Sequence, residues 1–142
     1  MNTWTVQFGA SPPFERPNQV GVAVWVEIDE IAPDTCITRC WKTEFVGMDW
    51  MQDLPIQERR QGLPFQLQQG LAADLLNSIR TARVGVAALG DLAYIHPMTY
   101  RLIIRSGFNG CSLEWVHELP LEWTELRKAV EVLESIGRSR EK

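Results

Sequence analysis

Residues 99–136 read TYRLIIRSGFNGCSLEWVHELPLEWTELRKAVEVLESI, and this stretch decides the fold. Two segments of alternating apolar and polar residues flank SGFNG, and a proline then opens an amphipathic run. Alternation with a period of two is typical of half-buried strands. Asn109 and Gly110 tolerate the positive φ angles that a tight reversal needs. The stretch therefore predicts a β-hairpin that leads into a C-terminal helix.

The two arms of this hairpin each have an apolar and a charged face. The apolar face comprises Tyr100, Leu102, Ile104, Cys111, Leu113, Trp115 and Leu119. The opposite face carries Arg101, Arg105, Glu114 and Glu118. We expect the two arginines to lie near the two glutamates, where exposed cross-strand pairs help register more than stability. His117 interrupts the apolar face, and we interpret it as a sheet-end histidine with a hydrogen-bond partner.

The last predicted helix begins at Pro120, where a missing backbone N–H costs nothing. Its apolar residues recur at spacings of three and four: Trp123, Leu126, Ala129, Val130, Leu133 and Ile136. Gly137 fits the position just past the helix end, and the tail beyond it is expected to fray. We interpret the apolar stripe as core that packs on the hairpin. Trp115 and Trp123 should therefore be buried and close to each other.

Length and composition predict one soluble domain spanning residues 1–142. The 142 residues are 45% hydrophobic and 23% charged, which is ordinary for a globular protein that buries a core. The net charge of −4 argues against a general nucleic-acid binder, because phosphate binding needs a surplus of Lys and Arg. No apolar run is long enough for a membrane span. The opening MNTWTVQF lacks a signal-type core, so we expect a cytoplasmic protein.

Two strands and a loop are expected before residue 30. Trp4, Val6 and Phe8 alternate with polar residues over 3–8 and predict the first strand. Residues 9–19, GASPPFERPNQ, predict a loop because prolines do not fit a central strand. Residues 20–28 are apolar on both faces, which is typical of a central strand. A loop or a second subunit can cover the second face, around Ala23 and Trp25, and this face motivates a homodimer.

A turn at residues 30–35, EIAPDT, precedes a third strand over about 37–46. One face of that strand carries Ile37, Trp41 and Phe45. Cys36 and Cys40 share the other parity, about 13 Å apart, which is too far for a disulfide or one metal ion. A zinc site of Cys36, Cys40, Cys111 and His117 matches no short paired-ligand motif. Buried thiols are the better interpretation, and no metal site is predicted.

Residues 47–63, GMDWMQDLPIQERRQGL, mix large apolar side chains with charges. One interpretation is a connector that folds over the core. The other is a recognition loop, because Trp, Met and Arg are favoured at the centres of interfaces. For the second interpretation the predicted partner-binding residues are Met48, Trp50, Met51 and Arg59, with Phe14 of the proline-rich loop as a second contact.

A first helix is expected from Pro64 or Phe65 to Arg83. Its stripe consists of Leu67, Leu71, Ala72, Leu75, Leu76 and Ile79. The chain shows no phosphate-cradling glycine loop, no HExxH, no nucleophile elbow and no CxxC pair. The sequence therefore predicts no catalytic residue and no cofactor.

The second half resembles emfourin, a family of small bacterial inhibitors of thermolysin-like metalloproteases. The similarity lies in LQQGLAADLLNSIR, TYRLIIRSG, SLEWV and LPLEWTELRKAVEVL. In that family too, a hairpin is followed by a helix that starts at Leu-Pro. The family's N-terminal glycine-rich turn is absent here, whereas the third strand and residues 47–63 are added. The resemblance implies a binding protein and carries over no inhibitory residue.

The sequence thus predicts an α+β fold in which an antiparallel sheet of about five strands is packed by two helices, in the order β-β-β-α-β-β-α. The favoured function is a non-enzymatic interaction protein: an inhibitor, an immunity or antidefence factor, or an assembly subunit. A small-ligand binder with a Trp-lined pocket between sheet and helices is the alternative. An enzyme with an unrecognised site is the third hypothesis.

Overall fold

One antiparallel sheet, in the strand order β3-β2-β1-β4-β5, forms the base of the computed structural model. The strands are β1 (Asn2–Ser11), β2 (Val20–Ala32), β3 (Thr35–Val46), β4 (Thr99–Ser106) and β5 (Asn109–Val116). The helices are α1 (Gln69–Thr81), the 3₁₀ segment η3 (Leu121–Leu126) and α2 (Arg127–Arg138). The structure describes residues 2–12, 20–32, 35–46, 64–83, 98–107 and 109–138. The predicted α+β fold and its element order are confirmed.

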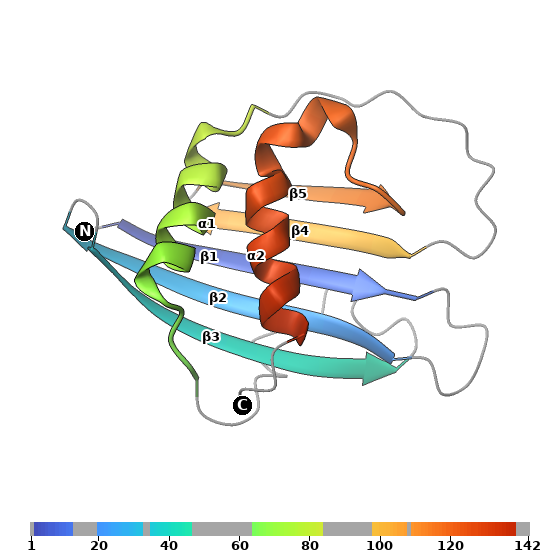
Figure 1. Cartoon of the computed structure of the whole chain (residues 1–142), viewed down its shortest axis with the longest axis horizontal. Helices are drawn as coiled ribbons and strands as arrows, with labels where there is room; N and C mark the ends of the chain where they lie inside the picture. Colours follow the sequence, from blue (N-terminus) through green and yellow to red (C-terminus); the bar gives the residue numbers. More distant parts are fainter. Residues whose placement is uncertain are drawn as a thin grey trace.

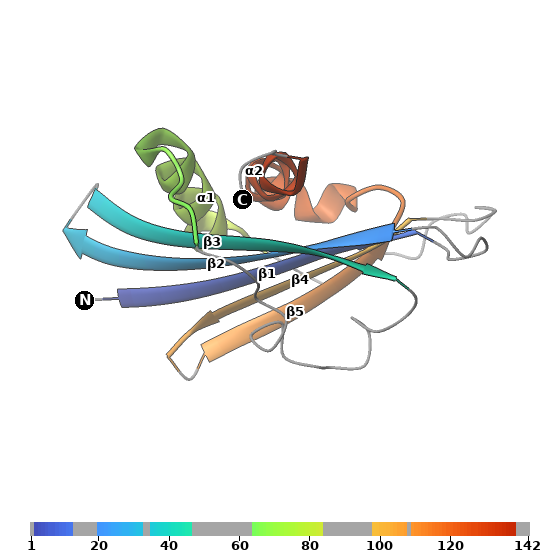
Figure 2. The same cartoon turned by 90° about the horizontal axis from the view of Figure 1, so that it is seen from below.

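Both helices lie on the same face of the sheet, as Figures 1 and 2 show. The core fills the space between these two layers. At its centre Val6 of β1 pairs with Val26 of β2 on one side and with Ile104 of β4 on the other. Leu75 of α1 and Leu133 of α2 are fully buried in the same cluster. Within the described residues, no helix is both long and apolar enough to cross a membrane.

Four aromatic rings link the hairpin to the helical layer. Trp115 of β5 stacks on Tyr100 of β4 with ring centroids 5.6 Å apart, and Phe8 of β1 lies 6.1 Å from Tyr100. Trp123 of η3 meets Trp115 edge to face at 6.3 Å. The two tryptophans are only 6% and 8% exposed. The prediction that they are buried and close to each other is confirmed.

The hairpin register corrects two details of the sequence prediction. Arg101 pairs with Glu114, and its Nε lies 3.1 Å from the carboxylate, as expected. Arg105, however, lies opposite Gly110, because β5 ends at Val116 and Glu118 falls beyond the far end of the strand pair. Among the described residues of the reversal, Gly107 has a positive φ. Asn109 and Gly110 belong to β5 and not to the turn.

The first helix is shorter than the predicted 64–83. Its regular bonding starts where the Ala72 N–H donates to the Gln68 carbonyl. The preceding residues are extended because Phe65 pairs with Cys40 of β3, through two backbone hydrogen bonds of 2.8 and 3.1 Å. Tertiary pairing therefore overrides the helical periodicity of the sequence, which includes Leu67.

The last helix also departs from expectation at both ends. The segment after Pro120 is 3₁₀ helix, and Trp123 has non-helical angles of φ −106° and ψ 22°, so the predicted single helix is kinked. Gly137 lies inside α2 and not beyond it. A Cβ atom there would lie 3.2 Å from Cγ1 of Val22. The glycine thus serves close packing of α2 on β2 in place of the predicted capping role.

Candidate functional site

The recognition segment predicted from the sequence lies outside the described residues. The same holds for all five predicted partner-binding residues, which are Phe14, Met48, Trp50, Met51 and Arg59. Their role stays a prediction. Within the described part of the chain, a different surface has the composition of a binding site. It lies where β2 ends and β3 begins.

The sheet face opposite the helices is buried around Trp25 and exposed toward the end of the sheet where β2 stops and β3 starts. Ala23 and Trp25, which motivated the predicted homodimer, are each only 3% exposed in the single chain. Trp25 lies between Gln7 of β1 and Trp41 of β3 in the strand register. Because both residues are already buried, this part of the face gives no reason for a dimer. Farther along β3, Ile37 is 43% exposed.

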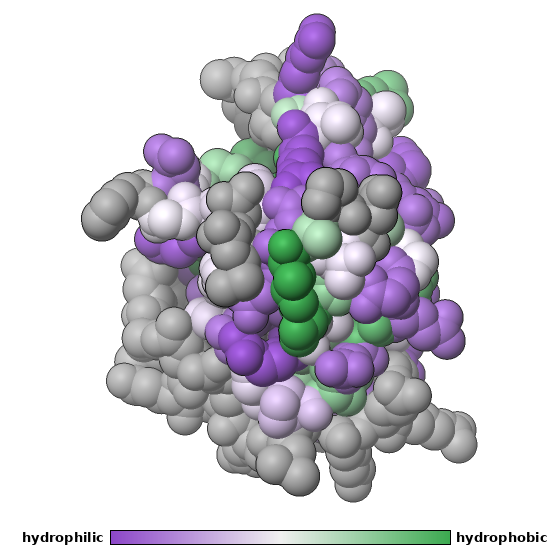
Figure 3. Space-filling view, turned by 90° about the vertical axis from the view of Figure 1, so that its left-hand side faces the viewer, coloured by the Kyte–Doolittle hydropathy of each residue, from purple (hydrophilic) through white to green (hydrophobic). Residues whose placement is uncertain are grey.

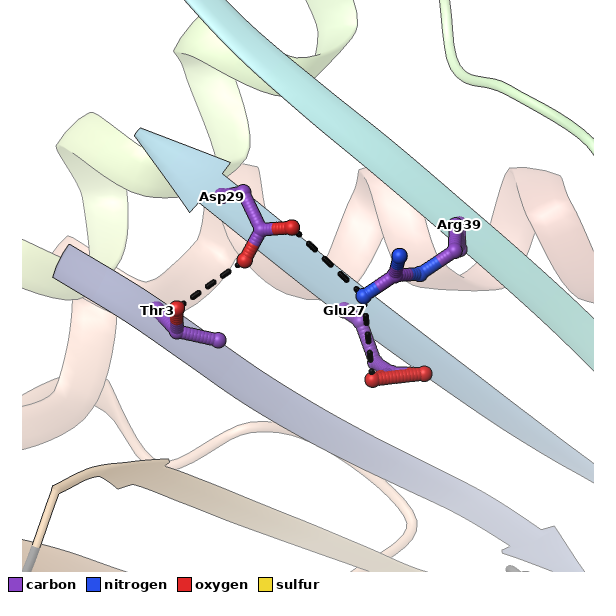
Figure 4. A network of polar contacts seen from close by, with 4 residues as sticks. All are labelled: Thr3, Glu27, Asp29 and Arg39. Carbon is purple, nitrogen blue, oxygen red and sulfur yellow. Dashed lines mark hydrogen bonds and ion pairs between the residues drawn. The ribbon is translucent and has the colours of Figure 1, made fainter. Parts of the chain in front are cut away.

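Four polar side chains from three strands interlock at the open end, as Figure 4 shows. The Thr3 hydroxyl of β1 donates to the Asp29 carboxylate of β2 at 2.9 Å. The Arg39 guanidinium of β3 reaches the carboxylates of Glu27 and Asp29, each at 3.5 Å. Ion pairs that are exposed to solvent stabilise a fold little, because water screens the charges. Their effect is to hold the charged groups in one arrangement.

Two exposed isoleucines, Ile31 and Ile37, lie beside this network and are called the isoleucine patch below. Ile37 pairs directly with Asp29, and Ile31 lies in the register irregularity between Glu30 and Ala32 of β2. Ile31 is 52% exposed. Figure 3 looks at this end of the molecule and shows an apolar strip bordered by hydrophilic side chains. The patch therefore combines an apolar centre with a polar rim.

A second ion pair fixes the rim on the helix side of the sheet. Arg80, in the last turn of α1, donates to the Glu30 carboxylate of β2, and this hydrogen bond raises the pKa of Arg80. The same guanidinium lies over the Trp4 ring, 5.8 Å from its centroid. Arg80 thereby joins α1 to β1 and β2, so the rim is attached to rigid elements on both sides.

The cysteines and histidine considered for a metal site are not brought together. Cys36 and Cys40 are buried on β3, whereas Cys111 is exposed on β5 at the opposite edge of the sheet. Four strand spacings of about 4.8 Å separate those edges by roughly 19 Å. Burial raises the pKa of Cys40 to about 12, which makes its thiol a poor nucleophile. Among the described residues no group of three His, Cys, Asp or Glu could hold a metal ion.

His117 takes a structural position at the end of the hairpin. Its backbone N–H donates to the Met98 carbonyl at 2.8 Å, and its φ of 67° places it in the left-handed region. The side chain is exposed. The position at the end of the sheet agrees with the interpretation of this residue, and a hydrogen bond of its imidazole ring stays a prediction.

Comparisons with known proteins do not assign a family. No family model matches the sequence, and no curated protein and no solved structure matches it. The resemblance to emfourin consequently stays a prediction.

The isoleucine patch was missed in the sequence for a physical reason. Ile31 falls in EIAPDT, for which the sequence predicts a turn, whereas β2 continues to Ala32 and β3 already begins at Thr35. Ile37 shares its strand face with Trp41. Periodicity reports which residues share a face, but not which end of that face is covered.

Proposed function

We propose that this chain is a non-enzymatic interaction protein that binds another protein through the isoleucine patch. An inhibitor, an immunity or antidefence factor and an assembly subunit all fit this description. The observation that carries the proposal is the exposure of Ile31 and Ile37 between two fixed ion-pair groups. Hot spots of protein interfaces have this anatomy, with an apolar centre inside a polar rim that excludes water.

The rigidity of the surroundings supports this assignment. Asp29 is held by Thr3 and Arg39, and Glu30 is held by Arg80, so the rim is ordered before a partner arrives. Binding to an ordered surface avoids much of the entropy cost of fixing side chains at the interface. The isoleucines themselves lose little side-chain freedom, because β-branched residues have few rotamers in a strand.

The charge balance indicates what kind of partner surface fits. Among the residues that the structure describes, the rim contains the three carboxylates of Glu27, Asp29 and Glu30 and the two guanidinium groups of Arg39 and Arg80. The whole chain also carries a net charge of −4. A folded partner with an apolar centre and a basic rim is complementary to both features.

The two alternative functions have less support. Between sheet and helices, the rings of Trp115 and Trp123 pack on each other and on Tyr100 as part of the core. An enzyme would need a nucleophile, an acid–base pair or a metal group in reach of a substrate. Cys40 is fully buried and its burial raises the pKa of the thiol, which is the opposite of nucleophile activation.

The test is affinity capture followed by titration with the captured partner. The double variant Ile31→Ser/Ile37→Ser should raise the Kd for that partner by about 30-fold or more, as expected for hot-spot residues. Leu121→Ser is the matched control, because Leu121 is 80% exposed but lies in η3, away from the patch. Equal affinities of the double variant and the wild type would refute the assignment to this patch.

Inhibition of thermolysin by the wild-type chain tests the emfourin-like role directly.

A further inference from the structure

The outer edge of β5 presents backbone groups that the described part of the chain does not use. β5 is the last strand of the sheet, at the top of the sheet in Figure 1. The His117 N–H donates to the Met98 carbonyl, and these two residues continue the β4–β5 register. Hydrogen-bonded pairs alternate along an antiparallel ladder. The N–H and C=O groups of Gly110, Ser112 and Glu114 therefore point away from β4.

At the opposite edge of the sheet, the chain covers β3 with its own residues. On β3, Cys40 pairs with the backbone of Phe65, and the Thr38 hydroxyl accepts the Leu67 N–H at 2.9 Å. The side chain of Gln69 bonds both backbone groups of Cys36. On β5 the described residues supply a single cover, the Glu118 N–H on the Val116 carbonyl at 2.8 Å.

We propose that a second copy of this chain covers the β5 edge, so that two β5 strands pair antiparallel across a twofold axis at Ser112. Ser112 then faces Ser112 of the second copy, and Gly110 faces Glu114 of the second copy. This register uses every outward group from Gly110 to Glu114, in about six hydrogen bonds. The run ends before Val116, whose carbonyl is already occupied.

The composition of β5 favours a second copy as the occupant. Glu114 is the single charged residue of the strand, and in this register it meets Gly110 and not a second carboxylate. Like charges directly opposite each other would be destabilising. On the helix side, the exposed Cys111 meets the half-buried Leu113 of the second copy, which places two apolar groups together. Shifting the register by two residues would leave one of the three outward residues without a partner.

This pairing is independent of the proposed function and leaves its site open. The isoleucine patch lies on β2 and β3, whereas β5 is at the other edge of the sheet. A dimer joined at β5 would thus carry two patches, one at each end of a continuous sheet. Such an arrangement would make the protein bivalent toward its partner.

Sedimentation equilibrium of the full chain over micromolar to millimolar concentration tests the proposal. The wild type should change from monomer to dimer in this range. Ser112→Pro removes the outward N–H at the twofold axis, and proline is tolerated at that position of an edge strand. This variant should stay monomeric with an unchanged circular dichroism spectrum. Ser112→Ala keeps the N–H and should dimerise like the wild type. A monomeric wild type, or dimerisation of Ser112→Pro at wild-type strength, would overturn the proposal.

Disulfide trapping tests the register. Hydrogen-bonded pairs have Cα atoms about 5.5 Å apart, which is within the range that a disulfide spans. The variant Cys111→Ser/Ser112→Cys should therefore form a covalent dimer on mild oxidation. Cys111→Ser alone, the matched control, should not. Faster crosslinking of the wild type through Cys111 than of the double variant would contradict pairing centred on Ser112.

Discussion

At the scale of single residues, the contact between Trp115 and Trp123 joins the hairpin to the helical layer. The rings meet at an interplanar angle of 84°, an edge-to-face geometry that aromatic pairs favour. Trp123 holds this position at the cost of helical geometry, because its own backbone angles interrupt η3. The packing of one side chain thus outweighs the regularity of the helix start.

Replacing either tryptophan should destabilise the protein strongly. Trp115→Ala and Trp123→Ala should each lower the free energy of unfolding by about 3–5 kcal/mol, since each removes a large buried side chain. Urea denaturation followed by circular dichroism measures the change. Leu121→Ala, at a side chain that is 80% exposed, should stay within about 0.5 kcal/mol of the wild type. Midpoints equal to the wild type for both tryptophan variants would contradict the placement of η3 on β5.

Two helical glycines should respond differently to the same substitution. A Cβ at Gly70 in α1 would meet no atom within 4 Å. Gly70→Ala should therefore stabilise the protein by about 0.5 kcal/mol through helix propensity and loss of unfolded-chain entropy. At Gly137 the new Cβ would lie 3.2 Å from Val22 and 3.6 Å from Val24. Gly137→Ala should gain less than Gly70→Ala in thermal denaturation, and a larger gain would show that α2 is not held this closely to β2.

The buried thiol of Cys40 predicts a loss of stability at high pH. Its pKa is about 12 in the folded protein and 9.0 without burial. Below pH 9 the Cys40 thiol keeps its proton in both the folded and the unfolded state, so the stability does not depend on pH through this group. Between pH 9 and 12 the unfolded chain releases the proton and the folded protein keeps it. Stability should then fall with pH, by up to about 1.4 kcal/mol per unit for this one proton.

Denaturation curves measured from pH 8 to pH 11 check this dependence. Cys40→Ala should give a shallower decline than the wild type, even though its stability at pH 8 is lower because of the lost packing. Cys111→Ala, at an exposed thiol, should keep the wild-type slope. A decline of equal slope in all three proteins would assign the effect to other groups.

At the scale of elements, the chain from Phe65 to Gln69, which leads into α1, covers the β3 edge. The Gln69 side chain donates to the Cys36 carbonyl at 2.7 Å and accepts the Cys36 N–H at 3.4 Å, as a neighbouring strand would. An amide side chain suits this role because it carries both a donor and an acceptor. The start of α1 is therefore tied to the sheet by hydrogen bonds as well as by apolar contacts.

Gln69→Ala should lower the free energy of unfolding by about 1–2 kcal/mol, because the partly buried N–H and C=O of Cys36 lose their hydrogen bonds to this side chain. Chemical denaturation measures this loss. Gln68→Ala is the matched control, since the neighbouring side chain is exposed and makes no capping hydrogen bond. It should change stability by less than about 0.5 kcal/mol. If both variants behaved alike, the Gln69 bonds would contribute nothing.

The same segment shows where sequence reasoning succeeds and where it ends. Alternation predicted β4 and β5, and helical spacing predicted α1 and α2, because each element buries one face. The helix start was misplaced at Phe65, since a periodic stripe cannot reveal that a backbone is needed to cover β3. Gly137 was read as a helix cap for a similar reason, because its contact with Val22 exists only in the folded molecule.

At the scale of the whole molecule, the two faces of the sheet differ in what covers them. The helices bury one face, whereas the other face is buried at Trp25 and exposed at Ile37, although the strand pattern is the same at both. The candidate site lies where this coverage stops. Coverage depends on the path of the entire chain, so no local pattern could have predicted the isoleucine patch.

The central place of β1 has a consequence for synthesis of the protein on the ribosome. β1 pairs with β2 soon after both emerge, but its other neighbour, β4, begins only at Thr99. At ordinary translation rates, on the order of ten seconds pass between the synthesis of β2 and the synthesis of β4. During that interval one edge of the oldest strand stays open on a half-built sheet. Chaperone contact with this protein should therefore concentrate on nascent chains that end between β3 and β4.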